Sequence, residues 1–222
     1  RVSRSSVPRQ PVRIGVARAR AFGFYYDHGL DLWTALGAEL VFFSPMDDVA
    51  LPSDLDGLYF GGGFPEIFAA ELAANTAMRA QIKAALEDGL PAYAECGGLM
   101  YLAESITDFE EREYPMVGFF NKKTAMTKRL QNFGYVSVTF DRDTVLGPAG
   151  TIIRGHEFHH SRIVDDEPDY VLNVRKSDTR GWRGGLKKKN VLAAYPHLHF
   201  YANPVLADYF LNQCRRFRNG RL

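Results

Sequence analysis

The sequence predicts an α/β domain in which a mostly parallel sheet is flanked by helices, with an antiparallel or mixed extension of the sheet in the second half. Three observations support this fold class. Strand and helix patterns alternate over the first hundred residues, which is typical of a parallel sheet with helical crossovers. Glycine-rich turns follow two of the buried strand patterns. Beyond residue 116 the apolar runs are short and β-like, and no long helix pattern appears until the C-terminus.

The first half contains four strand patterns and four helix patterns. The strand patterns cover residues 12–17, 39–43, 55–60 and 91–94, and the helix patterns cover residues 31–37, 65–74, 76–87 and 98–105. Gly37 and Gly89 are expected to end two of the helices, because glycine readily adopts the left-handed conformation that follows a helix. Asn75 separates the second and third helices. Right-handed crossovers then fix most of the topology.

The second half is expected to be rich in strands separated by turn residues. The β-like runs cover residues 116–120, 135–140, 150–155, 170–174 and 191–195. Asn203 and Pro204 are expected to open a C-terminal helix that continues to about Arg218, because Pro is favoured in the first helical turn.

Composition excludes several classes of protein. The 222 residues include 27 Lys and Arg against 26 Asp and Glu, a formal net charge of +1, which gives no support to a nucleic-acid or anionic-membrane surface. No apolar stretch approaches the ~18 residues that a membrane span needs. Two cysteines, Cys96 and Cys214, exclude a disulfide framework, so we expect a reducing, cytoplasmic compartment.

The N-terminal residues predict a linker. Residues 1–11 are dominated by Ser, Arg and Pro and show no apolar periodicity, so they are expected to be a linker or the remnant of an upstream domain, with a plain N-terminal tail as the alternative. Residues 12–222 are expected to form one domain, since this length suits a single α/β core.

The strongest chemical signal is Cys96, which stands between a short buried strand pattern and the helix that begins after Gly97 and Gly98. This order resembles the nucleophile elbow of hydrolases, which exposes a side chain at the carboxyl edge of the sheet. The helix N-terminus is expected to favour the thiolate and to present N–H groups to an oxyanion. The alternative is a buried structural cysteine, because free cysteines are among the most buried residues.

A cysteine nucleophile needs a base, and the chain has six histidines. His197 and His199 follow a strand pattern whose end can lie beside the elbow, and the alternation of a strand puts both on the same side. Periodicity therefore does not choose between them. The Gly61–Gly63 turn lacks the pattern of a phosphate-binding P-loop and is interpreted as a second source of oxyanion N–H groups, with a tight structural turn as the alternative.

One motif resembles a zinc site but is not interpreted as one. Residues 156–160 (HEFHH) match the HExxH pattern of zinc proteases. That motif binds zinc only on a helix, where the two histidines lie one turn apart. The surrounding residues are β-branched and follow Gly155, which predicts a strand, so no metal site is expected.

Several motifs together resemble one family. The segments YFGGGFPE, GLPAYAECGGLMYL, MTKRLQNFGYV, RGHEFHHSRI and NVLAAYPHLHF occur in this order. They closely resemble the glutaminase domains of the cobyrinic acid a,c-diamide synthase family, in the Cys-His branch of the class I-like glutamine amidotransferases, whose fold is flavodoxin-like. The resemblance extends over about residues 12 to 215. It implies hydrolysis of glutamine to glutamate and ammonia, which an ATP-dependent synthetase domain, in cis or in trans, would use to amidate a cobalt corrinoid.

The resemblance also implies roles for individual residues. Cys96 matches the family's nucleophile and His197 its base, with His199 as the second choice. Ordinary class I relatives have a Pro-Glu pair after the histidine, whereas this chain has Leu198 and His199, so a Cys-His dyad is expected, with His199 at most a second partner. Arg129 matches a position that holds the glutamine carboxylate in related enzymes. The backbone N–H groups of Gly62, Gly63 and Gly97 are expected to bind the oxyanion.

The expected partners are glutamine and the synthetase domain, with no nucleic acid and no membrane. No cofactor is expected in this chain, because the P-loop half that binds ATP and Mg is absent from its sequence. Alternatives are a cobyric acid synthase-like or cell-wall amidating glutaminase, a non-catalytic scaffold of the same fold and, less well supported, a thiol peptidase.

Overall fold

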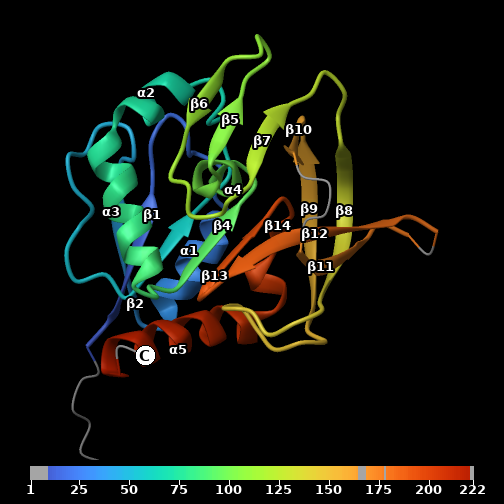
Figure 1. Cartoon of the computed structure of the whole chain (residues 1–222). Coiled ribbons are helices and arrows are strands. Elements are labelled where there is room, and N and C mark those ends of the chain that lie inside the picture. Colours follow the sequence, from blue (N-terminus) through green and yellow to red (C-terminus); the bar gives the residue numbers. More distant parts are fainter. Residues whose placement is uncertain (1–9, 165–168, 178, 221–222) are drawn as a thin grey trace, which may run out of the picture.

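The computed structural model describes residues 10–164, 169–177 and 179–220, and a ten-stranded sheet forms its centre (Figure 1). The strand order is β14-β9-β8-β11-β12-β13-β4-β3-β1-β2. Of the predicted linker, only residues 10 and 11 belong to the described part of the chain; residues 1–9 lie outside it. Within that part no helix is both long and apolar enough to cross a membrane.

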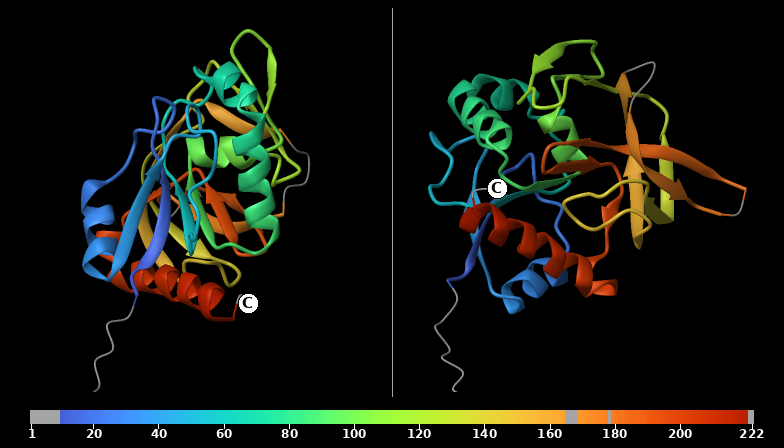
Figure 2. Two further views of the ribbon diagram at one scale, coloured as in Figure 1. Left: turned by 90° about the vertical axis from the view of Figure 1, so that its left-hand side faces the viewer. Right: turned by 60° about the horizontal axis from the view of Figure 1, so that its bottom comes forward.

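Five strands at one side of the sheet are parallel, as the alternating pattern predicts. They are β2 (Ala38–Phe43), β1 (Val12–Ala17), β3 (Gly57–Phe60), β4 (Ala92–Glu95) and β13 (Val191–Ala194). β3, β4 and β13 are buried along their whole length, because helices cover both faces of this part of the sheet. Figure 2 shows the helices on the two sides of these strands.

The helices form two groups. α2 (Ala69–Ala74), α3 (Thr76–Glu87) and α4 (Gly97–Leu102) pack on one face, and α1 (Asp27–Ala35) and α5 (Pro204–Gly220) pack together on the other. Asn75 separates α2 from α3, as predicted, because its side chain accepts a hydrogen bond from the Met78 N–H at 3.3 Å and caps α3. Apolar residues therefore meet the sheet from both sides.

The predicted antiparallel extension is confirmed. Beyond β13 the sheet continues through β12 (Gly181–Lys188), β11 (Tyr170–Arg175), β8 (Asn132–Phe140), β9 (Ile152–His159) and β14 (His197–Leu198), and every pair in this part is antiparallel. These strands curl away from the parallel half as a half-barrel (Figure 2). A second sheet has the order β10-β7-β5-β6, formed by β10 (Ser161–Val164), β7 (Lys123–Met126), β5 (Ser105–Thr107) and β6 (Glu113–Pro115). A 3-10 turn, η1 (Phe200–Ala202), precedes α5.

Several elements differ from the sequence prediction. α1 begins at Asp27 rather than at Asp31, and α2 begins at Ala69 rather than at Pro65. α4 ends at Leu102 rather than near Ser105, because Ser105 begins β5. The apolar run 116–120 is not a strand. Its N–H groups instead donate to carbonyl oxygens at the end of α4, from Val117 to Tyr101 at 3.0 Å and from Phe119 to Leu102 at 3.1 Å. The run caps a helix whose last carbonyls would otherwise be unpaired. A tertiary contact of this kind produces no periodic pattern of apolar residues, so the sequence does not reveal it.

Candidate active site

Cys96 occupies the sharp turn between β4 and α4, as the sequence predicts. Its φ of 48° and ψ of −102° are unusual for a residue other than glycine. The Cys96 N–H donates to the Ala194 carbonyl at 2.7 Å, which continues the pairing of β4 with β13 up to the turn. A Cβ on Gly98 would lie 2.5 Å from the Phe60 carbonyl oxygen, so α4 can start this close to β3 only with glycine there.

The thiol faces a cavity of about 410 Å³, a volume in the usual range for small-molecule sites. Five segments surround it: the turn after β3, the elbow, the loop between β5 and β6, the end of β7 with the loop that follows it, and the junction of β9 with β10. The lining residues are Gly63, Phe64, Glu66, Cys96, Met100, Phe109, Met126, Lys128, Phe158, His159, His160 and Ser161. The antiparallel half of the sheet therefore supplies one wall of a pocket whose thiol comes from the parallel half.

Burial, and not the helix N-terminus, has the largest effect on the pKa of the Cys96 thiol. Desolvation raises the pKa of Cys96 to about 12, while the nearby Gly97 N–H lowers it and the carboxylates of Glu66, Glu95 and Glu157 raise it further. The Gly97 N–H at the start of α4 thus lowers the pKa, as predicted, but burial outweighs this effect. A protonated thiol needs a base to remove its proton before it can act as a nucleophile.

The glycine turn after β3 lies against the elbow. A Cβ on Gly97 would lie 3.2 Å from the Gly63 nitrogen, so the backbones of the two glycines approach each other closely. The Gly63 N–H has no hydrogen-bond partner among the described residues. The Gly62 N–H, in contrast, donates to the Phe24 carbonyl at 3.1 Å. Gly62 was expected to donate to an oxyanion, but its N–H group is already paired.

Position 62 must be glycine for a different reason, because the imidazole of His197 packs directly against it. A Cβ at position 62 would overlap the His197 Cε1 atom. His197 is buried at the start of β14, which pairs with β9 through His156. Within the described part of the chain the Cys96 thiol hydrogen-bonds to the Phe158 carbonyl at 4.0 Å and not to His197. The geometry thus brings His197 onto the glycine turn that flanks the elbow, without a direct bond to sulfur.

His199 points elsewhere. β14 ends at Leu198, and His199 begins the η1 turn, so the strand alternation that would put both histidines on one side does not continue. The His199 Nε2 lies 3.2 Å from the Tyr26 hydroxyl, and the two rings meet edge to face. Among the two candidates only His197 lies against the glycine turn.

The basic loop between β7 and β8 places Lys128, and not Arg129, on the cavity. The Arg129 side chain is exposed, while its carbonyl oxygen accepts hydrogen bonds from Thr127 at 2.8 Å and Gln131 at 3.0 Å. Glu66, a second charged residue on the cavity, was not selected by sequence reasoning. Burial raises the pKa of its carboxyl group. The only sequence signal for Glu66 is its position directly after the glycine turn, within GGGFPE.

The first four residues of the HEFHH motif, His156–His159, lie on β9 and His160 directly follows it, which confirms the strand prediction. At ~3.3 Å per residue, His156 and His160 are about 13 Å apart along the chain and cannot share a metal ion. Among the residues that the structure describes, no group of three His, Cys, Asp or Glu side chains could hold a metal ion.

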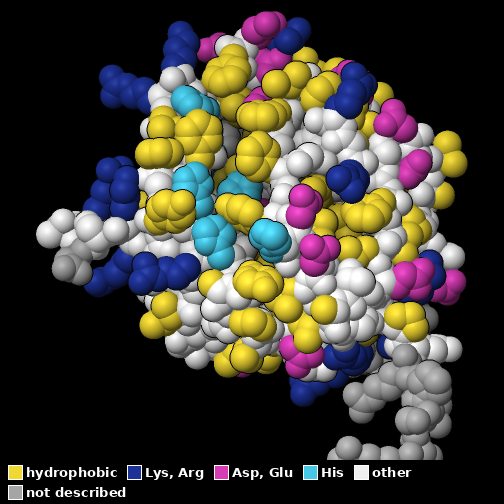
Figure 3. All heavy atoms as spheres, turned by 180° about the vertical axis from the view of Figure 1, so that it is seen from behind, with side chains coloured by type: hydrophobic (Ala, Val, Ile, Leu, Met, Phe, Trp, Pro, Cys, Tyr) yellow, Lys and Arg dark blue, Asp and Glu magenta, His cyan; other side chains and the backbone are white. Residues whose placement is uncertain are grey.

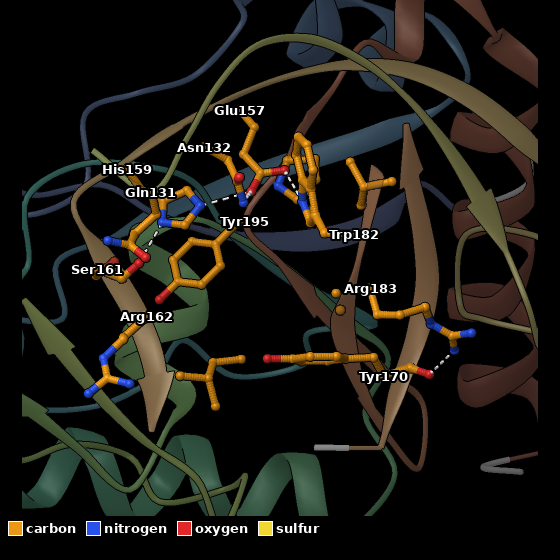
Figure 4. Close-up of a pocket in the computed structure, with 15 residues that line it drawn as sticks. Gln131, Asn132, Glu157, His159, Ser161, Arg162, Tyr170, Trp182, Arg183 and Tyr195 are labelled. Carbon is orange, nitrogen blue, oxygen red and sulfur yellow. Dashed lines mark hydrogen bonds and ion pairs between the residues drawn. The ribbon is translucent and has the colours of Figure 1, made fainter. Parts of the chain in front are cut away.

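The other side of β9 carries a buried polar network (Figure 4). The Glu157 carboxylate accepts hydrogen bonds from Asn132 at 3.0 Å and Trp182 at 3.2 Å, and lies 2.8 Å from the His159 Nε2. The His159 Nδ1 lies 2.7 Å from the Ser161 carbonyl, and its ring stacks on Tyr195 at 3.7 Å. His159 and Ser161 line both this pocket and the Cys96 cavity, so the motif builds the wall between the two.

Histidine and aromatic side chains gather on the face shown in Figure 3. The exposed aromatic residues Phe24, Phe158 and Tyr135 are 61%, 46% and 75% exposed, respectively. Phe24 contacts the ring of His197, and Tyr135 contacts those of His156 and His199. This face therefore surrounds the histidine-bearing edge of the site.

Solved structures with the same architecture define the class of protein. PurLQS from Thermotoga maritima matches with a TM-score of 0.63 and 18% identity, covering 95% of this chain and 100% of that chain. A glutamine amidotransferase from Thermotoga maritima matches with a TM-score of 0.57 and 12% identity, covering 94% and 86%. The fold is that of the class I glutamine amidotransferases.

Sequence comparison identifies the family. Residues 13–205 match the CobB/CobQ-like glutamine amidotransferase domain, and the chain belongs to this family. The cobyrinate a,c-diamide synthase of Dehalococcoides mccartyi (strain 195) is 45% identical over 216 residues, 95% of this chain and 46% of that protein. That of Listeria innocua is 48% identical over 198 residues, 88% and 43%. The chain thus spans about half the length of these relatives and is a glutamine amidotransferase domain.

The raised pKa predicts how Cys96 reacts with iodoacetamide. The thiolate is the reactive form, so the alkylation rate should rise about tenfold per pH unit between pH 7 and 9, without a plateau. Mass spectrometry of the labelled chain measures this rate. Cys214 is an internal control, because it is fully buried in α5 and should stay unlabelled while the chain is folded. A plateau for Cys96 by pH 8 would contradict the buried, protonated thiol.

Proposed function

We propose that this domain hydrolyses glutamine to glutamate and ammonia through a thioester on Cys96. The observation that carries the proposal is a cysteine on a strained strand-to-helix turn that opens into a 410 Å³ cavity. Membership of the amidotransferase family supports the same reaction.

The base in this mechanism is His197. Because burial keeps the Cys96 thiol protonated, its proton must pass to a base as sulfur attacks the carboxamide carbon of glutamine. His197, on the glycine turn next to the elbow, is suited to take that proton after a small movement. The imidazolium then gives the proton to the departing nitrogen, which leaves as ammonia. Water next attacks the thioester carbon, which releases glutamate and restores the thiol.

Gly63 and Gly97 supply the oxyanion donors. Their backbones approach each other closely, and the Gly63 N–H is unpaired in the described part of the chain. Loss of one such donor typically costs ~10²–10³ in rate. Gly62 contributes by its lack of a side chain, since any Cβ would displace His197.

The two charged ends of glutamine have partners on the cavity wall. Lys128 presents a cation to the α-carboxylate, and Glu66 presents an acceptor to the α-ammonium group. Arg129, the position expected from family resemblance, follows Lys128 on the same loop and is exposed. We assign the carboxylate contact to this loop, with Lys128 as its main residue.

The ammonia is used by a second protein part. The curated relatives named cobyrinate a,c-diamide synthase are about twice as long as this chain, so the amidation step belongs to sequence beyond this domain. We assign the domain to ATP-dependent a,c-diamidation of cobyrinic acid, with an ATP-dependent synthetase as partner. ATP and Mg would bind to that partner.

Replacing the nucleophile is the direct test. Cys96→Ser should lower glutamine hydrolysis by about 10³-fold or more, because a hydroxyl is far less acidic than a thiol. Glutamate release is measured with the synthetase part present. Free ammonia should still support amidation by that complex. A Cys96→Ser variant that keeps a large share of its glutaminase rate would refute the thioester mechanism, and a wild-type domain without glutaminase activity would favour a scaffold.

The two histidines provide a matched pair of variants. His197→Ala should lower kcat/KM for glutamine by about 10²-fold or more, the effect typical of losing a general base. His199→Ala should cost less than about tenfold, because its ring faces Tyr26 and not the glycine turn. Steady-state glutaminase kinetics measure both. The reverse order of effects would transfer the role of base to His199.

Neighbouring cations on one loop give a second matched pair. Lys128→Ala should raise KM for glutamine about two- to fivefold with little change in kcat, since Lys128 lines the cavity but is exposed, and an exposed ion pair is worth ~1 kcal/mol or less. Arg129→Ala should have a smaller effect on KM, because Arg129, which is equally exposed, does not line the cavity. If Arg129→Ala raises KM more than Lys128→Ala does, the contact expected from the resemblance is the correct one.

A further inference from the structure

The residue directly before the nucleophile is a buried carboxylate that the sequence analysis did not single out. Glu95 is the last residue of β4 and its side chain is 1% exposed. Burial of a charge is costly unless hydrogen bonds compensate for it. Such a residue therefore needs donors around it, and their identity shows what its position serves.

The donors to Glu95 come from elements far apart in the sequence. Its Oε2 accepts hydrogen bonds from the Leu198 N–H at 2.8 Å and the Tyr93 hydroxyl at 2.9 Å. Its Oε1 accepts one from the Tyr59 hydroxyl and lies 4.0 Å from the His197 Nδ1. The bond to Leu198 is important because it ties the main chain next to His197 to the residue next to Cys96, across 103 positions of sequence.

Among the described residues, Glu95 is the one negatively charged side chain that faces His197; the other titratable groups around it include two histidines. His156 on β9 and His199 after β14 face it as imidazoles, and burial lowers the pKa of both, with the nearby His197 lowering it further. Glu157 lies on the other side of β9, where Asn132, His159 and Trp182 bind it (Figure 4).

We propose that Glu95 is the positioning residue of the site: its carboxylate orients His197 through Nδ1 and stabilises the imidazolium that forms during the reaction. This inference rests on the proposed glutaminase function and deepens it. In triads of this kind the acid holds the imidazole in the tautomer whose Nε2 is free to act as base. Here the acid does not follow the histidine in the sequence; it immediately precedes the nucleophile.

The carboxylate is well suited to this task because it is already fixed. Three hydrogen bonds from Leu198, Tyr93 and Tyr59 hold it, so little freedom is lost when the imidazole turns toward it. The Tyr59 and Tyr93 rings stack at 5.7 Å and keep both hydroxyl groups aimed at the same carboxylate. Glu95 and its three donors are almost fully buried, and this low-polarity surrounding strengthens the attraction between carboxylate and imidazolium.

The decisive variant is Glu95→Gln, which keeps the volume and removes the charge. Its amide can donate to the His197 Nδ1 and thereby select the wrong tautomer. We expect kcat for glutamine hydrolysis to fall about 10- to 100-fold with KM little changed.

Tyr93→Phe is the matched control. It removes one hydrogen bond to the same carboxylate but leaves the charge, so kcat should stay close to that of the wild type even if the domain loses stability. Thermal unfolding of both variants separates folding from chemistry. A Glu95→Gln variant whose kcat lies within twofold of the wild type would overturn the inference.

A measurement on the unsubstituted chain guards against a Glu95→Gln protein that does not fold. Nitrogen-15 NMR of the histidine rings reports which ring nitrogen carries the proton in neutral His197. We expect Nδ1–H, directed at Glu95, and protonation on Nε2 instead would refute the inference. If Cys96→Ser and His197→Ala abolish activity while these tests fail, only the role of Glu95 is wrong; if those two variants stay active, the proposed function itself fails.

Discussion

The backbone turn at Cys96 constrains the surrounding structure more than any single contact does. A non-glycine residue at φ 48° and ψ −102° stores strain of order 1–3 kcal/mol, which neighbouring packing must sustain. That packing comes from Gly98 against Phe60 and from Gly97 against Gly63, so the two glycine turns of the parallel sheet are built as one unit. Their N–H groups and the thiol consequently meet at the carboxyl edge, where open α/β sheets bind their ligands.

Burial then determines what kind of chemistry this turn supports. The enclosed thiol has a raised pKa, and the carboxylates around it raise it further, so a preformed thiolate is disfavoured. The same enclosure fixes Glu95 and its donors beside His197. In the proposed mechanism one proton moves between sulfur and imidazole, and the low local polarity makes the position of each neighbouring charge matter.

The antiparallel half of the sheet completes the site. Side chains alternate along β9, with His156 and Phe158 on one side and Glu157 and His159 on the other, and the end of this strand forms the wall between the Cys96 cavity and the polar pocket of Figure 4, since His159 lines both. The bonds of Glu157 to Asn132, His159 and Trp182 hold three strands, β8, β9 and β12, in fixed register behind that wall. The conspicuous HEFHH motif is thus part of the scaffold of the pocket.

The sequence by itself determined the alternating α/β order, the antiparallel extension and the elbow at Cys96, because hydrophobic period, glycine turns and helix caps are local signals. It could not separate His197 from His199, since that choice depends on where β14 ends and η1 begins. Nor could it show that Gly62 has a committed N–H, that Lys128 and not Arg129 lines the cavity, or that Glu95 lies beside His197. Only the tertiary structure decided these points, because each depends on segments distant in sequence that packing alone brings together.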